Sequence, residues 1–484
     1  MQTMKKTGKL LVFSLVTSFL LLLICSKCSP LYPFNDWVDV HCFLTVGRGI
    51  KHGLVPYRDL YEQKGPLLYF LVAIATLFSE TSFLPLFMME VVFYALYIFE
   101  SMKIVLLWTE NKAVYLFAPF VFMTVTVSLA FYYGFSAEEL CLPFLAMPLQ
   151  IVLTHFRKAT ELRKQECFII GICAATSFWI KYVFCGFFVG LVLIVSLWHY
   201  QERKNIVNSM ISSIAGFFSV TIPILGWYAA KGGLKDLFQV YFYNNIMFYP
   251  GEQTTPVMIA SQLAQSLMKD SFLWALLGLA GIVYLAVSFK NNQWEFLTIL
   301  ATLVMVVVFI TMTNRYFVYY SLLLALYTPL VLIPIGVLIH MGKTGAKGFA
   351  ALLALSITLA TVASYAISPN TYMIGVSRKS LPQYVFAEIM HEKKENPTLL
   401  NYEFLDGGFY YAAGILPINR FSCKFNIYLS EQILEQKTLL EEGKVDFVVT
   451  RDRTSIPGNK YQIISSMELF SYPFNFTYYL FERM

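Results

Sequence analysis

The chain has 484 residues, of which 57% are hydrophobic and only 14% are charged. This composition lies outside the range of soluble globular proteins and is typical of polytopic membrane proteins. The formal net charge of +6 is small, and Lys and Arg are spread over short segments between apolar runs. Binding to nucleic acid is therefore not expected.

The first element is an apolar run over residues 10–24, which three lysines precede. Secretory signal peptides share this arrangement, and the residues up to Cys25 faintly resemble a lipoprotein cleavage site. We favour an uncleaved first membrane span, because the run is long for a signal peptide, a charged residue, Lys27, stands two positions after Cys25, and many apolar runs come later.

Eleven apolar runs are long enough to cross a bilayer, at about 20 residues per span. They are residues 9–27, 83–107, 113–132, 139–156, 167–182, 183–199, 206–229, 271–289, 295–313, 316–340 and 347–367. The expected fold is therefore mainly α-helical and polytopic, with about 11 transmembrane helices.

The orientation follows from the segments that are rich in Lys and Arg, because such loops stay in the cytoplasm. These segments are the N-terminal lysines, 103–112, 155–164, 201–204, Lys290 and 340–347. They fall on one side only if the short apolar run 66–78 does not cross the membrane. We expect this run to be interfacial or re-entrant, and the N-terminus to be cytoplasmic.

Two loops are expected on the outer side within a transmembrane domain that spans residues 1–367. The first, 28–82, is long and structured, with an amphipathic helix over 38–52 and the short apolar run. The second, 230–270, is rich in Tyr, Phe and Asn.

Hydropathy falls from residue 368 onward, which predicts a small extracytoplasmic α/β domain over 368–484. Charged helices and short β-like runs alternate here. The helices are expected near 381–395 and 428–442, and the strands at 399–405, 445–450, 461–465 and 476–482.

Charged side chains at the outer ends of the spans are the candidate site residues, because charge held at that depth costs several kcal/mol without partners or a task. They are Asp36, Asp39, Arg58, Asp59, Glu62, Lys64, Glu138, Glu139, Lys181 and Arg315. Carboxylates that take a proton and cations that hold a leaving phosphate suit transfer from a lipid phosphate to a hydroxyl. No GxGxxG or P-loop string is present. Asp36 and Glu80 fit ordinary loop charges more readily than the other acidic residues do.

The first outer loop resembles that of the GT-C glycosyltransferase superfamily. The nearest relatives by resemblance are bacterial family 39 type proteins, related to protein O-mannosyltransferases and to the lipid A aminoarabinose transferase. The matching pattern is D-x-x-x-F, then G-x-x-P-Y-R-D-x-x-x-x-K-G-P, from Asp39 to Pro66. The strings SAEELCLPF and LDGGFYYAAGILP and the paired spans around Lys181 extend the resemblance over most of the chain.

The resemblance implies an enzyme that moves a sugar from a polyprenyl-phosphate donor to an acceptor hydroxyl outside the cytoplasm, with inversion at the anomeric carbon. Asp39 matches the position of the general base, and Asp36 is the fallback. Lys64 matches the lysine that holds the donor phosphate, while Arg58, Lys181 and Arg315 are weaker phosphate ligands. Tyr57, Asp59 and Glu62 complete the expected first-loop site.

Glu138 or Glu139 matches an acidic position where the family more usually has Asp. This departure leaves open whether the carboxylate positions a metal, the acceptor or only the first loop. Members of the superfamily differ in metal dependence, so a divalent cation such as Mg²⁺ or Mn²⁺, held by Asp39 and Glu139, stays an open alternative to a metal-free site.

The expected location is the plasma membrane, with the active site and the C-terminal domain outside. The donor would be of the undecaprenyl type if the source is bacterial, and the acceptor a glycan, a glycolipid or a protein. The sugar is not predicted.

A transporter or flippase of lipid-linked sugars is one alternative, but its charges would lie in mid-span, where only Glu90 and Glu100 are found. A surface polysaccharide polymerase shares the composition without the K-G-P element. A scaffold that acts through the C-terminal domain leaves the first loop unexplained. Cys42 and Cys423 would both lie outside and are expected to be free thiols.

Overall fold

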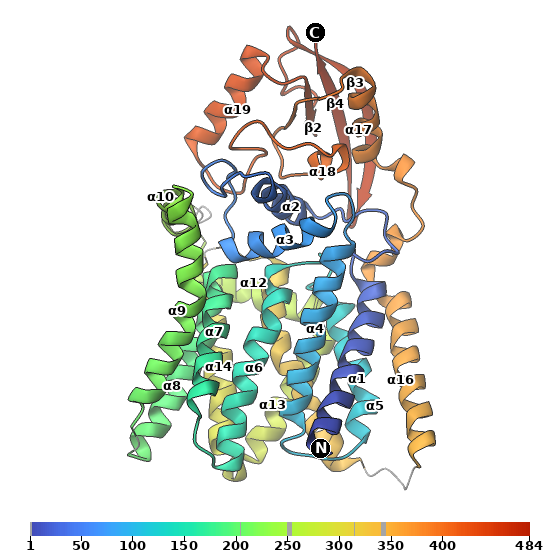
Figure 1. The fold of residues 1–484 in the computed structure, drawn as a ribbon. Coiled ribbons are helices and arrows are strands. Elements are labelled where there is room, and N and C mark those ends of the chain that lie inside the picture. Colours follow the sequence, from blue (N-terminus) through green and yellow to red (C-terminus); the bar gives the residue numbers. More distant parts are fainter. Residues whose placement is uncertain (1, 204, 249–253, 314, 340–344) are drawn as a thin grey trace. The chain divides into compact units, whose positions relative to one another are not determined.

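The structure is a computed structural model that describes residues 2–203, 205–248, 254–313, 315–339 and 345–484 (Figure 1). The chain forms two compact units. Unit 1 comprises Met1–Ser26, Phe87–Pro223 and Gly251–Thr371, and unit 2 comprises Lys27–Leu86, Ile224–Pro250 and Tyr372–Met484. Each unit thus combines segments that are far apart in the sequence.

Unit 1 is built from apolar helices of 7 to 24 residues. They are α1 (Gln2–Cys25), α4 (Leu84–Val105), α5 (Ala113–Thr126), α6 (Ala137–Lys158), α7 (Lys164–Ile180), α8 (Cys185–Gln201), α9 (Val207–Ala230), α12 (Pro256–Lys269), α13 (Phe272–Val287), α14 (Gln293–Thr311), α15 (Leu332–Leu338) and α16 (Ala346–Ile367). The 3-10 segments η1 (Tyr182–Phe184), η3 (Phe289–Asn291), η4 (Val318–Val331) and η5 (Pro369–Met373) connect or extend them.

Eight helical segments of the described chain are long and apolar enough to cross a membrane, and the pair α12 and α13, bent by 101°, makes nine if it counts as one span. All eight coincide with predicted spans. The other three predicted spans correspond to the shorter helices α5, α7 and α13. The prediction of a mainly α, multi-pass membrane protein is therefore confirmed, whereas the count of eleven stays a prediction.

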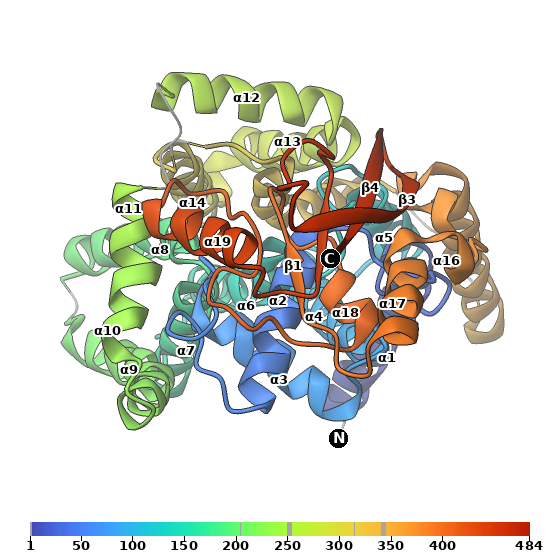
Figure 2. The same cartoon turned by 90° about the horizontal axis from the view of Figure 1, so that it is seen from above.

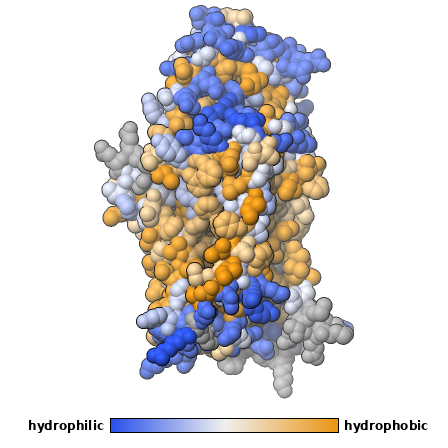
Figure 3. Space-filling view, turned by 60° about the vertical axis from the view of Figure 1, so that its left-hand side comes forward, coloured by the Kyte–Doolittle hydropathy of each residue, from blue (hydrophilic) through white to orange (hydrophobic). Residues whose placement is uncertain are grey.

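The outer surface of unit 1 is apolar. On α9, Met210, Ile211, Ile214, Phe218 and Ile222 are all more than half exposed or close to it. Figure 3 shows a band of hydrophobic side chains over the helices, bordered by hydrophilic ones where the inter-helix loops lie. Such a surface is stable in lipid, where the helices satisfy their own backbone hydrogen bonds.

Two segments of unit 1 differ from their predicted form. Helix α5 ends at Thr126 rather than near 132, where Thr124, Thr126 and Ser128 donate side-chain hydrogen bonds to carbonyls three residues earlier. Such bonds compete with the helical backbone pattern. The predicted span 316–340 begins instead as the 3-10 helix η4.

The predicted loop 230–270 is largely helical in its described part. It contains α10 (Leu234–Leu237), a π-helical turn η2 (Phe238–Asn244), α11 (Asn245–Met247) and α12. The hydroxyl of Thr255 accepts a hydrogen bond from the backbone N–H of Met258, and Pro256 occupies the first helical position of α12. A Thr-Pro pair of this kind is a helix-start signal.

Unit 2 contains two helices in the predicted first outer loop. Helix α2 runs over Val38–Lys51, which agrees with the helix predicted over 38–52, and the predicted short apolar run 66–78 forms helix α3 (Pro66–Phe78). At about 1.5 Å per residue, α3 is shorter than the ~30 Å hydrocarbon core of a bilayer. That it stays on one side of the membrane remains a prediction.

The C-terminal part of unit 2 contains a four-stranded sheet in the order β1-β2-β4-β3. Its elements are η6 (Arg378–Ser380), α17 (Pro382–Lys393), β1 (Leu399–Asn401), α18 (Phe409–Ala413), α19 (Ser430–Glu442), β2 (Phe447–Thr450), β3 (Tyr461–Ser471) and β4 (Phe474–Arg483). Strands β1 and β2 are parallel, and the other pairs are antiparallel. The predicted helices and strands are all present.

The two faces of this sheet are covered by different helices. Leu439 and Leu440 of α19 pack with Val448 and Phe481, whereas Phe409 of α18 contacts the ring of Tyr478. Because successive residues of a strand point to opposite faces, α18 and α19 lie on opposite sides, as Figure 2 shows. The predicted small α/β region is confirmed.

Candidate active site

Asp39 and Lys64 of unit 2 form a partly exposed ion pair. Asp39 lies in the first turn of α2, where the helix dipole favours a carboxylate. The Lys64 Nζ lies 3.6 Å from Asp39 Oδ2 and 3.9 Å from Glu62 Oε1. The same ammonium lies 5.6 Å from the ring centroid of Phe43. The side chains of Lys64 and Asp39 are 16% and 14% exposed, so both remain within reach of a ligand.

The backbone around Lys64 is held by its neighbours. Glu62 accepts hydrogen bonds from the backbone N–H of Lys64, at 2.8 Å, and from the hydroxyl of Tyr69. The hydroxyl of Tyr57 donates to the carbonyl of Lys64 at 2.6 Å, and the Tyr57 ring stacks on Tyr228. The predicted residues Tyr57 and Glu62 therefore position Lys64.

Arg58 and Asp59 pair with each other. Their two hydrogen bonds are both 2.8 Å long, and a third donor of Arg58 bonds the carbonyl of Lys231 at 2.6 Å. Arg58 lowers the pKa of Asp59 through the hydrogen bonds of this pair. The contacts of Arg58 are thus with the segment after α9 rather than with Lys64.

Asp36 is enclosed by partners. Its Oδ1 lies 2.5 Å from Lys27 Nζ, and its Oδ2 accepts a hydrogen bond of 2.6 Å from the hydroxyl of Tyr372. The side chain is 0% exposed. Burial alone would raise the pKa of Asp36, but the charge and hydrogen bond of Lys27 outweigh it and lower the pKa. This geometry suits a structural link between the first loop and the C-terminal segment.

Glu80 is the acceptor for two cationic side chains of α2 and for the imidazole of His52, which follows the helix. Lys51 lies 2.6 Å away, His52 3.2 Å and Arg48 3.3 Å. Partial burial opposes ionisation, but hydrogen bonds from Lys51, His52 and Arg48 lower the pKa of Glu80 to about 2. Glu80 therefore holds α2 to the chain after α3.

Helix α2 is also fastened to the C-terminal segment of its own unit. Thr45 donates to Asp406 at 2.7 Å, and Arg48 donates to the carbonyls of Tyr410 and Ile415, both at 3.2 Å. Gly408 takes φ +86°, and a Cβ there would lie 2.4 Å from Cζ of Phe34. Only glycine fits this approach. The string LDGGFYY thus anchors the helix that carries Asp39.

The cysteines of α2 and the C-terminal segment are free. Cys42 and Cys423 are buried, and their thiols hydrogen-bond to each other. That contact and burial raise the pKa of Cys42 well above its usual value. The prediction of free thiols agrees with the structure.

A second polar cluster lies in unit 1 at the start of α6. Glu138 Oε1 lies 2.5 Å from Lys181 Nζ, and this ammonium lies 3.8 Å from the ring centroid of Tyr320. Glu138 is 1% and Lys181 11% exposed. The structure thus brings together two predicted residues and adds Tyr320, which sequence reasoning missed although it belongs to the aromatic string 316–320.

Glu139 belongs to the same turn. The backbone N–H of Phe135 donates to Glu139 Oε2, at 3.2 Å, and to Glu90 Oε1, at 2.5 Å. Ser26 also donates to Glu90, at 2.6 Å. One oxygen each of Glu138 and Glu139 is buried without a hydrogen-bond partner among the described residues. The signal for Glu90 was its place inside an apolar span.

Arg315 lies half-buried between α14 and η4, where its carbonyl accepts a hydrogen bond of 2.6 Å from Thr313. Within the described ranges, no group of three or more His, Cys, Asp or Glu side chains could hold a metal ion. Asp39 and Glu139 belong to different units. A divalent cation held by Asp39 and Glu139 stays a prediction.

A family model described as "Putative competence-induced protein Ccs4 N-terminal domain" matches residues 2–349. The chain belongs to this family. The match ends in the first turn of α16, so the sheet of this Ccs4-family chain lies beyond it. No curated protein matches the sequence.

Two solved structures are similar to this Ccs4-family chain over nearly its whole length. ArnT of Cupriavidus metallidurans bound to undecaprenyl phosphate has a TM-score of 0.59 and 9% identity, with 98% of each chain covered. The apo form of the same protein gives 0.58 and 8%, with 99% of this chain and 98% of that chain covered. At this identity the similarity shows the fold alone, which is that of the ArnT structures.

Proposed function

We propose that this protein is an inverting glycosyltransferase, which moves a sugar from a polyprenyl-phosphate donor to an acceptor hydroxyl on the outer side of the plasma membrane. The observation that carries the proposal is the partly exposed Asp39–Lys64 pair, which provides a proton acceptor and a phosphate-binding cation 3.6 Å apart. The pair lies on a GT-C type of fold, and the similar ArnT structure contains undecaprenyl phosphate.

In the proposed reaction the acceptor oxygen attacks the anomeric carbon from the face opposite the lipid phosphate. Asp39 takes the hydroxyl proton as the new C–O bond forms. The bond between the anomeric carbon and the phosphate oxygen breaks, and its electron pair leaves with the polyprenyl phosphate. Lys64 stabilises this anion, and the configuration at the anomeric carbon is inverted.

The shared position of Lys64 links donor binding to the base. Without a donor, the ammonium is near both Asp39 and Glu62. A donor phosphate that binds Lys64 competes with Asp39 for it, and Asp39 is then left free to accept a proton. Glu62 and Tyr57 keep the backbone of Lys64 in place while its side chain changes partner.

The polar residues of unit 1 are proposed to bind a phosphate or to support the residue that does. Lys181, with Glu138 and Tyr320, is a preorganised cation for a phosphate, and Glu139 holds the turn before α6. Arg315 is a further candidate phosphate ligand. Arg58 and Asp59 contribute by fixing the first loop to the chain after α9 rather than by binding phosphate.

Binding of undecaprenyl phosphate to the purified protein tests the phosphate site. Lys64→Ala removes a charge-assisted contact, so the dissociation constant should rise about 10-fold or more. Lys444→Ala, at an exposed lysine of the C-terminal region, is the matched control and should leave binding unchanged. Equal affinity of the wild-type protein and Lys64→Ala would contradict the proposed site.

A further inference from the structure

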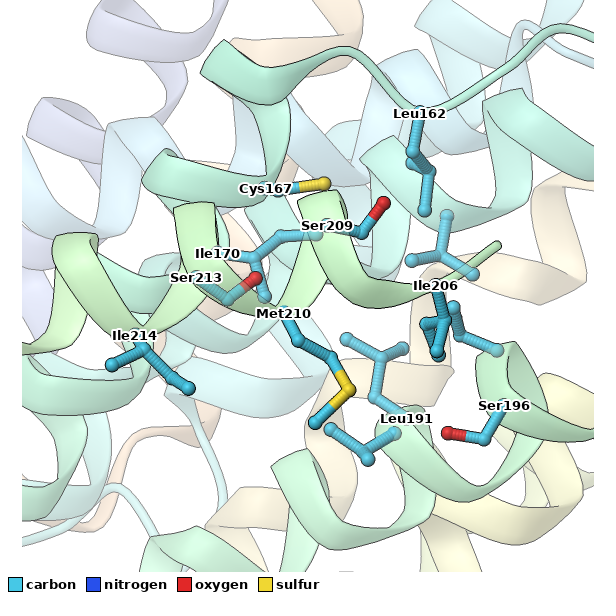
Figure 4. Close-up of a pocket in the computed structure, with 13 residues that line it drawn as sticks. Leu162, Cys167, Ile170, Leu191, Ser196, Ile206, Ser209, Met210, Ser213 and Ile214 are labelled. Carbon is cyan, nitrogen blue, oxygen red and sulfur yellow. The ribbon is translucent and has the colours of Figure 1, made fainter. Parts of the chain in front are cut away.

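Unit 1 contains an apolar cavity of about 210 Å³ between α7, α8 and α9, away from the polar clusters described above. Its wall includes Ile170 of α7, Leu191 of α8 and Met210 of α9 (Figure 4). Figure 4 shows Met210 extending from α9 toward Leu191. Leu162 and Ile206, also labelled there, belong to the loops just before α7 and α9. The cavity therefore reaches the level of two inter-helix loops.

Close contact between α7 and α9 beside the cavity explains why it exists. A Cβ on Gly171 would lie 1.9 Å from the carbonyl oxygen of Ser213, and one on Gly216 would lie 2.0 Å from that of Phe168. The backbones thus touch near these glycines, as small residues allow in membrane helices. From this contact toward residues 162 and 206 the wall keeps small side chains, among them Cys167 and Ser209, which leave space unfilled.

The wall contains few polar groups, and two of them form a hydrogen bond with each other. The thiol of Cys167 hydrogen-bonds to the hydroxyl of Ser209, so neither calls for a polar ligand. The adjoining surface of α9 exposes Met210, Ile211 and Ile214. Because these residues face the lipid of a multi-pass protein, a hydrocarbon chain is the occupant that fits the cavity.

The cavity ends beside charged loops. Lys158 ends α6, Lys164 follows Leu162 of the cavity wall by two residues, and Arg203 precedes Ile206 by three. All three cations belong to exposed residues. Cations at the membrane surface attract anionic lipid headgroups. An acyl chain in the cavity would place its headgroup at these loops.

We propose that this cavity binds one acyl chain of an anionic glycerophospholipid, whose negatively charged headgroup lies at residues 158–164 and near Arg203. The site is separate from the donor site proposed above and needs no catalytic step. Its occupant fills the space between α7, α8 and α9 and so stabilises their packing.

Photocrosslinking of the full-length protein in lipid nanodiscs tests this site. The probe is phosphatidylglycerol with a photoreactive acyl chain, compared with the same probe built on phosphatidylcholine. We expect crosslinks in residues 162–170 and 206–214. The yield should be higher for the phosphatidylglycerol probe than for the phosphatidylcholine probe, by about five-fold for each cation that contacts the headgroup. Lys164→Gln and Arg203→Gln should each remove about that factor.

Filling the cavity gives the second arm of the test. Ser213→Leu on α9 and Ser196→Leu on α8 should each reduce the crosslinks at these segments several-fold, because both side chains line the cavity. Ser219→Leu, on an exposed position of α9 outside the cavity, is the matched control and should leave the yield unchanged. The two variants lie on different helices, so the test can still be read if one of them fails to fold.

Three results would overturn the proposal. They are equal yields for the two probes, unchanged crosslinks in both Ser213→Leu and Ser196→Leu, and displacement of the anionic probe by an equal concentration of undecaprenyl phosphate. The last result would identify a polyprenyl site instead. None of these results bears on Asp39 and Lys64, so the two proposals fail independently.

Discussion

At the scale of residues, the structure gives different surroundings to two aspartates, of which the sequence favoured Asp39 as the base and kept Asp36 as the fallback. Asp36 lies two residues before α2, and Asp39 is the second residue of the helix. Only the folded chain shows that Asp36 is closed off by Lys27 and Tyr372, the latter 336 residues away. A partner so distant leaves no local pattern, whereas the resemblance already pointed to Asp39 and Lys64.

Replacing Asp36 should lower the stability of the protein, whereas replacing Asp39 should lower its activity. Asp36→Asn leaves the buried ammonium of Lys27 without its counter-ion, which typically costs about 3–5 kcal/mol of folding free energy. Asp39→Asn, at a partly exposed position, should leave the melting temperature nearly unchanged and affect turnover instead. Thermal unfolding of both variants in detergent checks this, and a large loss of stability in Asp39→Asn alone would contradict it.

Glu80 predicts a pH dependence of stability. Its pKa is lowered to about 2 in the folded protein, from an ordinary value of 4.5. Its stabilising contribution is therefore present above about pH 4.5 and is lost as the pH falls toward 2. The difference in melting temperature between wild type and Glu80→Gln should be largest near neutral pH and shrink below pH 4.5. A difference that grows on acidification would refute this assignment.

At the scale of elements, helices whose ends are marked by local signals were predicted well. Helix α2 follows a clear apolar pattern and agrees with the predicted helix, and α3, which begins at Gly65-Pro66, has the bounds of the predicted short apolar run. Helix α12 lies in the predicted loop 230–270. The Tyr, Phe and Asn residues of that segment favour a loop, whereas Thr255-Pro256 is the local signal that marks the start of the helix. The early end of α5 depends on side-chain bonds to carbonyls, which apolar composition does not reveal.

The anchoring of α2 by the C-terminal segment can be tested at two glycines. Gly408 and Gly414 both have positive φ, so alanine at either should cost about 1–2 kcal/mol. At Gly408 the new Cβ also meets Phe34 and His41 within 2.6 Å, which adds about 1–3 kcal/mol, whereas nothing lies within 4 Å at Gly414. Gly408→Ala should therefore melt clearly below Gly414→Ala, and equal melting would show that this contact is unimportant.

At the scale of the whole molecule, composition and the periodicity of apolar residues were sufficient for the class of fold. Eight of the predicted spans are long apolar helices, and the four strands follow the predicted β-like runs. The grouping of Lys27–Leu86 with the C-terminal segment in one unit was not foreseen, because it depends on contacts between residues hundreds of positions apart. Sidedness stays a prediction from the basic loops.

Cysteine labelling tests the predicted sidedness. Thr81→Cys, at an exposed position after α3, should react with a membrane-impermeant maleimide in intact cells. Lys290→Cys, in a loop predicted to be cytoplasmic, should react only after permeabilisation. The wild-type protein, whose cysteines are mostly buried, gives the background. The reverse pattern would place the first loop on the wrong side for the proposed chemistry.

The most direct measurement of the central claim is sugar transfer in membranes supplied with labelled polyprenyl-phosphate sugars. The wild-type protein should release one polyprenyl phosphate for each sugar transferred. Asp39→Asn should lower the rate about 10²- to 10⁴-fold, as expected for loss of a general base. Asp452→Asn, an exposed aspartate of the C-terminal region, should behave as wild type. Transfer at the wild-type rate by Asp39→Asn would contradict the account.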